Sequence, residues 1–191
     1  MTIKYKVLAL VGPAGAGKDT ICNEIVNNYK YNKIVSYTTR PARSNEIEGK
    51  DYYFVTKEEF DNLDLLEYTI FKENWYYGTS TESLKANTWN IGVFNPEGVN
   101  SLKQREDIDL LVWYVKAKDI NRIKRQLLRE KKPSIKEIIR RYFADKKDFK
   151  NFDSITDWIV YNDTEQQLHY IICDAKYLSL QLDNKKRRKS E

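Results

Sequence analysis

A glycine-rich run near the N-terminus has the residue types and the spacing that bind phosphate. Gly12, Gly17 and Lys18 fit the pattern G-x-x-x-x-G-K. Glycines let the backbone wrap around a phosphate with its N–H groups pointing inward, and a following helix adds the positive end of its dipole. Lys18 is expected to reach the β- and γ-phosphates of ATP. An apolar run before the loop and helical spacing after it favour this interpretation over that of a structural turn. The predicted ATP-contacting residues are Gly12, Ala14, Gly15, Ala16, Gly17, Lys18, Asp19 and Thr20.

The residue after the lysine departs from the usual pattern. Asp19 stands where a Ser or Thr normally ligates magnesium, and Thr20 follows one position later. Phosphoryl transfer from ATP needs Mg²⁺ to bridge the β- and γ-phosphates, and we expect Asp19 to ligate this ion directly or through a water, with Thr20 nearby. Alternatively, Asp19 only stabilises the first turn of the helix through its dipole.

A second motif-rich segment follows the loop and its helix. The run 36–43 reads Ser-Tyr-Thr-Thr-Arg-Pro-Ala-Arg, the run 49–55 reads Gly-Lys-Asp-Tyr-Tyr-Phe-Val, and Tyr-Tyr-Gly-Thr occupies 76–79. Together with the glycine-rich loop and Tyr-Asn-Asp at 161–163, these segments resemble the guanylate kinase family. The resemblance spans nearly the whole chain and is strongest between Gly12 and Thr79.

The resemblance implies an acceptor site for GMP. Arg40 and Arg43 would grip the acceptor phosphate, because guanidinium groups match phosphate oxygens bidentately. Glu67 would accept hydrogen bonds from guanine N1–H and the 2-amino group, with Ser36 and Thr79 near O6. The predicted GMP-binding residues are Ser36, Arg40, Arg43, Glu46, Tyr52, Glu67, Tyr77 and Thr79.

The resemblance also implies a lid carrying arginines. Arg125 and Arg129 resemble the pair that precedes the family's lid, and Arg141 resembles the arginine on the following helix, although Arg140 is an alternative. These side chains would neutralise charge on the transferring phosphoryl group. A plain basic helix face is the other interpretation. The predicted catalytic residues are Lys18, Arg129 and Arg141, and no general base is needed because the acceptor phosphate is already ionised.

One family feature is missing. Guanylate kinases have an Asp-x-Asp pair at the end of the strand after the inserted lobe, and the corresponding positions hold Val93 and Asn95. The expected function is transfer of the γ-phosphoryl group of ATP to GMP or dGMP. Two alternatives stay open: a kinase for another, even modified, deoxynucleoside monophosphate, and a non-catalytic guanylate kinase-like binding module. The intact loop with Lys18 argues against the module.

Around these motifs, strands alternate with helices, which predicts an α/β fold with a five-stranded parallel sheet flanked by helices. The expected core strands are 5–11, 34–36, 90–94, 110–115 and 158–161. We predict one domain over 1–184, with core segments 1–36 and 90–184, an inserted monophosphate-binding lobe at 37–89, a lid near 129–147 and a basic tail at 185–191. Pairs of Thr-x-x-Glu and Ser-x-x-Glu at Thr56 and Ser134 predict capped helix starts.

The composition of the chain limits the kinds of partner that it is expected to bind. Five of the 33 Lys and Arg residues lie at 185–189, so the remaining 28 balance the 28 acidic residues. A balanced body argues against nucleic acid as a partner, and the chain has no apolar run long enough for a membrane helix. With only two cysteines in no metal-ligand spacing and no signal-peptide pattern, we expect a cytoplasmic protein. The sequence leaves the oligomeric state open.

Overall fold

The computed structural model describes residues 4–42, 46–71, 74–129 and 133–187. These residues form two compact units. The first contains the N-terminal residues through Ala9 together with Asn32–Leu111, and the second contains Leu10–Tyr31 together with the chain from Val112 onward.

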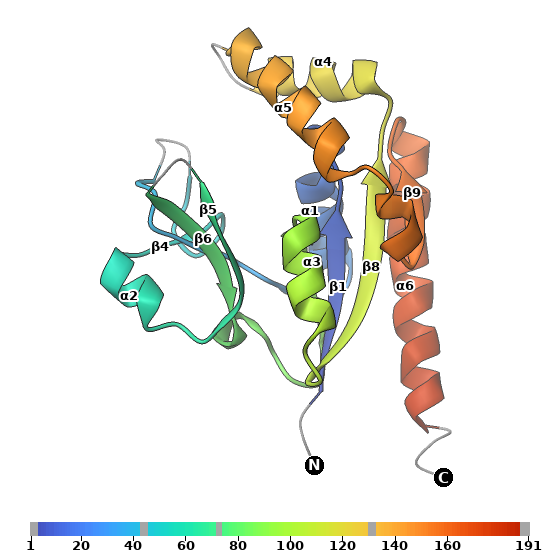
Figure 1. Cartoon of the computed structure of the whole chain (residues 1–191). Coiled ribbons are helices and arrows are strands. Elements are labelled where there is room, and N and C mark those ends of the chain that lie inside the picture. Colours follow the sequence, from blue (N-terminus) through green and yellow to red (C-terminus); the bar gives the residue numbers. More distant parts are fainter. Residues whose placement is uncertain (1–3, 43–45, 72–73, 130–132, 188–191) are drawn as a thin grey trace. The chain divides into compact units, whose positions relative to one another are not determined.

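A five-stranded sheet confirms the predicted fold class. Its order is β2 (Asn32–Lys33), β7 (Trp89–Phe94), β1 (Tyr5–Val11), β8 (Ile108–Lys116) and β9 (Trp158–Tyr161), as Figure 1 shows in part. The β2–β7 and β8–β9 pairs are parallel. The strand expected at 34–36 begins earlier instead, at Asn32. Ile34 nevertheless donates its N–H to the carbonyl of Ile91 at 2.8 Å, so the apolar residue continues the edge pairing although it lies outside β2.

Helices begin where the capping patterns place them. In α2 (Lys57–Asp61), Thr56 and Glu59 form the full reciprocal capping box. The Ser134 side chain accepts the Glu137 N–H at the start of α5 (Ile135–Asp148). Thr164 does the same for the Gln167 N–H at 3.2 Å in α6 (Glu165–Arg187), which runs into the basic segment. The other helices are α1 (Lys18–Asn28), α3 (Pro96–Lys103) and α4 (Asp119–Arg129), with short 3₁₀ turns at Thr81–Ser83 and Phe152–Ile155.

The first unit also holds a four-stranded sheet, inside the predicted lobe. Its order is β4 (Tyr53–Phe54), β3 (Tyr37–Thr38), β6 (Trp75–Ser80) and β5 (Leu65–Phe71). β5 and β6 form an antiparallel hairpin in which Glu67 stands opposite Thr79 (Figure 1). A side chain at Gly78 would meet the carbonyl oxygen of Glu67 at 2.9 Å, so this position must stay small for the hairpin to close.

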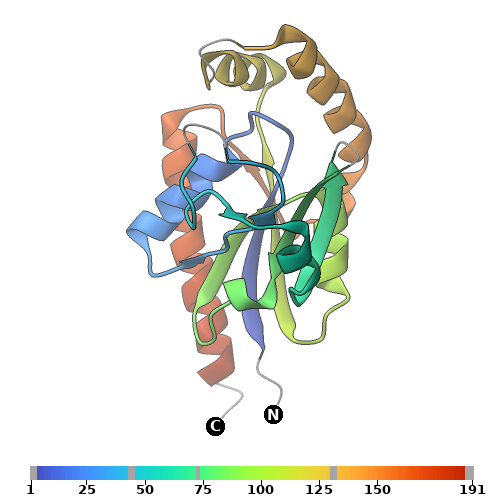
Figure 2. The same cartoon turned by 90° about the vertical axis from the view of Figure 1, so that its left-hand side faces the viewer.

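Apolar burial explains why the elements of each unit hold together. In the second unit, α1 packs against α6 (Figure 2). Among the fully buried side chains of the first unit are Phe60, Ile91, Val99 and Leu102, and among those of the second are Val11, Ile21, Ile25, Val112, Trp113, Val115 and Ala175. Of the helices in the described ranges, none is both long and apolar enough to cross a membrane.

Candidate active site

The phosphate loop joins the end of β1 to the start of α1. Gly15 and Gly17 have φ values of 78° and 93°, in the left-handed region that glycine adopts without strain. Crowding adds to this constraint, because a Cβ on Gly15 would lie 2.4 Å from the carbonyl oxygen of Arg122. The loop therefore depends on glycine at both positions, as the sequence pattern requires.

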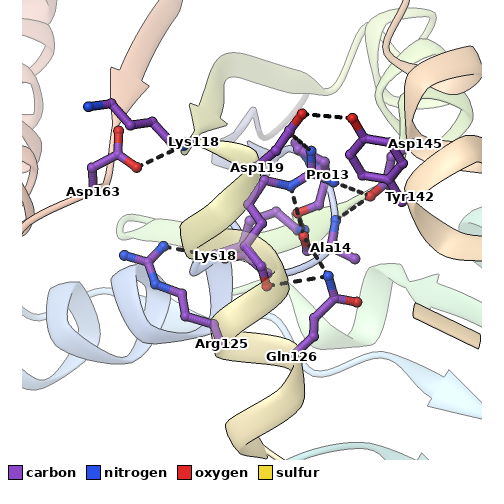
Figure 3. Close-up of polar contacts among 12 residues, drawn as sticks. Pro13, Ala14, Lys18, Lys118, Asp119, Arg125, Gln126, Tyr142, Asp145 and Asp163 are labelled. Atoms are coloured by element: carbon purple, nitrogen blue, oxygen red, sulfur yellow. Dashed lines mark hydrogen bonds and ion pairs between the residues drawn. The ribbon is translucent and has the colours of Figure 1, made fainter. Parts of the chain in front are cut away.

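Lys18 is folded back on the loop it follows. Its Nζ donates to the carbonyl oxygens of Gly12 at 2.6 Å and Pro13 at 3.2 Å (Figure 3). Burial lowers the pKa of Lys18, while the nearby Asp19 and Asp145 carboxylates act in the opposite direction. A nucleotide phosphate would be a stronger partner for this ammonium group than two neutral carbonyls, so the side chain is placed to exchange partners when an anion enters.

Two residues from other elements brace the loop. Asn162, which follows β9 and is 5% exposed, donates from Nδ2 to the Ala16 carbonyl at 2.9 Å. Arg125 on α4 donates from Nη2 to the Asn162 carbonyl at 2.7 Å and from Nη1 to the Gly15 carbonyl at 3.3 Å. Arg125 was expected to face the transferring phosphoryl group, whereas here its guanidinium holds loop carbonyls.

The two predicted lid arginines are brought together. Arg129 at the end of α4 and Arg141 on α5 line the same small cavity, together with Gln126 and Glu137. Arg141 donates from Nε to Glu137 at 2.9 Å, and Arg140 donates from Nε and Nη2 to both oxygens of the same carboxylate. These hydrogen bonds lower the pKa of Glu137 to about 2, and those from Arg140 have the largest effect. Of the two candidate arginines, Arg141 faces the cavity.

In the first unit, a chain of polar groups links Ser36, Thr79 and Glu67. The Thr79 hydroxyl donates to Oε1 of Glu67 at 2.8 Å and lies 3.3 Å from the hydroxyl of Ser36. Burial raises the pKa of Glu67, although the hydrogen bonds from Thr79 oppose the shift. Oε2 of Glu67 lies near the first turn of α3, since a Cβ on Gly98 would be 3.2 Å from it. Three predicted guanine-facing residues thus form one polar group.

Three other predicted acceptor residues gather around the guanidinium of a fourth, Arg40. Arg40 is 4% exposed and donates from Nη2 to both oxygens of Glu46, at 2.8 and 2.9 Å. Its Nε donates to the hydroxyl of Tyr77 at 3.0 Å, and its guanidinium lies over the ring of Tyr52. Its Nη1 donates to the neighbouring Pro41 carbonyl at 2.6 Å. Arg43, the second arginine predicted to bind the acceptor phosphate, lies outside the described residues.

The strand-end position without a carboxylate has a structural role. Asn95 is the N-cap of α3, and its Oδ1 accepts the Gly98 N–H at 2.6 Å. Val93 lies on β7 and is half-buried. Because Asn95 Oδ1 and Glu67 Oε2 both lie within 3.2 Å of the Gly98 Cβ position, a neutral cap avoids placing two carboxylates at one helix start.

The donor groups predicted to hold magnesium occupy the first turn of α1. Asp19 and Thr20 are both exposed and follow Lys18 directly. Within the described ranges, no three His, Cys, Asp or Glu side chains gather closely enough to form a metal site by themselves. An ion here would take most of its oxygen ligands from a nucleotide and from water, which is how Mg²⁺ is usually held. Asp19 and Thr20 fit that arrangement.

Comparison with known proteins identifies the family. The family model described as "Guanylate kinase" matches residues 4–173. The chain belongs to the guanylate kinase family. It is 31% identical over 170 residues to a guanylate kinase of Wigglesworthia glossinidia brevipalpis, covering 83% of this chain and 81% of that protein. A guanylate kinase of Clostridium tetani is 45% identical over 80 residues, an alignment that covers 40% of this chain and only 38% of that protein.

A solved structure supports the fold. The crystal structure of guanylate kinase from Anaplasma phagocytophilum has a TM-score of 0.60 and 24% identity, over 96% of this chain and 88% of that one. Membership of the guanylate kinase family confirms the resemblance found in the sequence and the enzyme class, a nucleotide-binding kinase.

Sequence reasoning missed two residues at the loop: Arg122 donates to the Ala14 carbonyl, and Asp145 accepts the Ala14 N–H. Arg122 carries a weak signal, because Arg122, Arg125 and Arg129 share the three- and four-residue spacing of one helix face. Asp145 carries none, because it is one acidic residue in a helix of mixed charge. The position of Asp145 at the loop becomes apparent only in the folded structure, where α5 brings its carboxylate to the Ala14 N–H.

Proposed function

We propose that this guanylate kinase family member transfers the γ-phosphoryl group of ATP to GMP or dGMP, giving ADP and GDP or dGDP. The observation that carries the proposal is the Ser36–Thr79–Glu67 group, a recessed carboxylate with two hydroxyls, in a chain that also has the phosphate loop with Lys18. A recessed carboxylate matches the two adjacent donors of guanine, N1–H and the 2-amino group. Adenine offers no such pair, so it would leave Glu67 unpaired.

In this proposal, the acceptor phosphate of GMP is bound by Arg40, together with Tyr52 and Tyr77. Glu46 now fills the Nη2 position of Arg40, so it either shares the guanidinium with the phosphate or gives it up. In both cases Glu46 and the tyrosines fix the orientation of Arg40 before the substrate arrives. Such preorganisation lowers the entropy cost of gripping a phosphate.

In this proposal, the negative charge on the transferring phosphoryl group is stabilised by Lys18, Arg129 and Arg141. The acceptor oxygen is already ionised, so the reaction depends on positioning and on stabilising charge rather than on a proton acceptor. Magnesium bound to ATP would add charge neutralisation between the β- and γ-phosphates. Asp19 and Thr20 are the residues that would hold it. A cytoplasmic location, and the absence of nucleic acid and membranes among the partners, stay predictions from the sequence.

The reaction itself tests the proposal. ATP, Mg²⁺ and GMP are incubated with the protein, and the ADP and GDP formed are separated and quantified. We expect equal amounts of both products from the wild type and a loss of at least about 100-fold in rate for Lys18→Ala, corresponding to roughly 3 kcal/mol of transition-state stabilisation.

The matched control is Lys4→Ala, which removes an exposed lysine at the start of the chain. This variant should keep the wild-type rate. Near-normal turnover by Lys18→Ala, or ADP formed without GDP, contradicts the proposal.

A further inference from the structure

An acidic side chain lies on the phosphate loop. Asp145, on α5, accepts the backbone N–H of Ala14 with its Oδ2 at 2.9 Å (Figure 3). Ala14 is the third residue of the G-x-x-x-x-G-K motif, whose backbone N–H groups serve to bind phosphate. A carboxylate therefore occupies a donor of the loop that an anionic ligand could otherwise use.

The carboxylate is held there by Arg122, which is 6% exposed. Its Nη2 donates to Oδ2 of Asp145 at 2.5 Å, and its Nε donates to the Ala14 carbonyl at 3.0 Å. Arg122 is fixed in turn by Asp119, which accepts from its Nη1 at 2.8 Å and from the hydroxyl of Tyr142 at 2.9 Å. Side chains from α4 and α5 thus bind both the N–H and the carbonyl of one loop residue.

The same carboxylate competes for the positive charge of the loop. Asp145 acts electrostatically on Lys18, and Lys18 and Arg122 both act on Asp145. Burial nevertheless raises the pKa of Asp145, so the charged form is costly in this position. A polyphosphate needs the same donors and the same lysine. Two anions at one small site repel each other, so the carboxylate must withdraw or the phosphate binds weakly.

We propose that Asp145 sets the affinity of the loop for its phosphate donor. The Asp145 carboxylate stands in for a phosphate when the loop is empty, and the polyphosphate of ATP displaces it from Ala14. Arg122, anchored to the loop by its Nε, then keeps its Nη2 donor available to the incoming phosphates. The inference rests on the proposed function only in taking ATP as the ligand of the loop.

Binding of polyphosphate measures this competition without any reaction. The affinities of tripolyphosphate and of ATP are determined by calorimetry for the wild type, Asp145→Asn and a matched variant, Asp148→Asn. Asp148 is an exposed carboxylate on the same helix that acts on Asp145 only electrostatically, so its change removes an equal charge and leaves the hydrogen bonds between Asp145 and the loop in place. If Asp145 occupies the loop about nine-tenths of the time, Asp145→Asn binds both ligands about tenfold more tightly. Asp148→Asn stays within about twofold of wild type. Unchanged or weaker binding by a folded Asp145→Asn variant overturns the proposal.

A structure of the wild type with a non-hydrolysable ATP analogue gives a second test, which does not depend on how the variants fold. We expect the hydrogen bond between Asp145 and the Ala14 N–H to be broken when the phosphates are bound. Its persistence near 2.9 Å beside bound phosphates contradicts the proposal. The two levels can fail separately: GDP formation with unchanged affinity rejects this inference alone, whereas tighter binding by Asp145→Asn without GDP formation rejects only the proposed reaction.

Discussion

At the scale of single residues, the carboxylates of the site differ because their surroundings differ. Burial raises the pKa of Glu67, whereas two arginines hold the pKa of Glu137 at about 2. Glu67 accepts a hydrogen bond from the Thr79 hydroxyl, and under the proposed function it would also accept the N–H donors of the base. Glu137 is neutralised within its own helix and serves to position arginines. Under the proposed function, the same chemical group thus recognises the base in one place and positions arginines in the other.

The raised pKa of Glu67 predicts opposite effects on stability and on activity. A carboxyl whose folded pKa lies above its ordinary value favours the folded state when protonated. That stability is present below the ordinary pKa and is lost as pH rises through the folded pKa. Glu67→Gln should therefore melt at a higher temperature than wild type at pH 7, with the difference fading in acid.

Activity with GMP should change in the other direction. Glu67→Gln is expected to lose about 2 kcal/mol in kcat/KM, or roughly 30-fold, because one guanine donor loses its acceptor. As the pH is lowered, the kcat/KM of the wild type should begin to fall at a pH that lies above the ordinary pKa of a glutamate. This decrease at low pH should be absent in the variant. Thermal melts and pH profiles of both proteins check these results. A variant that is less stable at pH 7 and equally active with GMP would show that Glu67 does not face the base.

The limit of sequence reasoning is clearest at this scale. Residue types in a motif indicated that Arg40 and Glu46 belong to the acceptor site, but not that they bind each other. The missing strand-end carboxylate was visible in the sequence, yet the cap made by Asn95 depends on where α3 begins. Asp145 could not be found at all, because its partner Ala14 is 131 positions away in the chain.

At the scale of elements, helix starts are what position the site. α1 begins at Lys18 directly after the loop, and α3 begins beside Glu67. These starts were predictable because caps and glycines are local signals. The bounds of strands were less predictable, since β2 begins two residues before the apolar run that was expected to form this strand. Edge strands depend on their neighbour for their limits, which a local pattern does not contain.

The cap of α3 gives a prediction at this scale. Asn95→Ala removes the acceptor for the Gly98 N–H and should cost about 1 kcal/mol of the free energy of unfolding. Asn95→Ser is the matched control, because serine keeps an N-cap acceptor without adding a charge beside Glu67, and it should stay within about 0.5 kcal/mol of wild type. Urea unfolding of the three proteins measures both values. Equal losses in the two variants would show that the cap is not the source of stability.

The hydrogen-bonded group of Glu137, Arg140 and Arg141 on α5 gives a second prediction at the scale of elements. A folded pKa below the ordinary value means that Glu137 adds stability above its ordinary pKa of 4.5, and that this stability is lost as pH falls toward about 2. Water screens these partly exposed side chains, so we expect Glu137→Gln to cost only about 0.5–1 kcal/mol at pH 7. The cost should vanish near pH 2, as measured by denaturant unfolding at both pH values. A cost that is independent of pH would exclude the ion pairs as its cause.

At the scale of the whole molecule, the proposed function divides the reaction between two groups of residues. The loop with Lys18, the arginines of α4 and α5, and Asn162 lie in one unit. The Ser36–Thr79–Glu67 group and Arg40 lie in the other. The alternation of strands and helices predicted the parallel sheet. Long-range side-chain pairs, such as that of Arg122 and Asp145, arise only from the folded arrangement.

The central claim is that a phosphate-loop kinase with this carboxylate pocket selects guanine. The most direct measurement is a comparison of kcat/KM for GMP, dGMP, AMP, CMP, UMP and TMP as acceptors, with ATP saturating and ADP release as the signal. The account predicts that GMP or dGMP exceeds each of the other four by at least about 100-fold, because only guanine satisfies Glu67 with two donors. AMP or TMP as the preferred acceptor would contradict the assignment of the pocket.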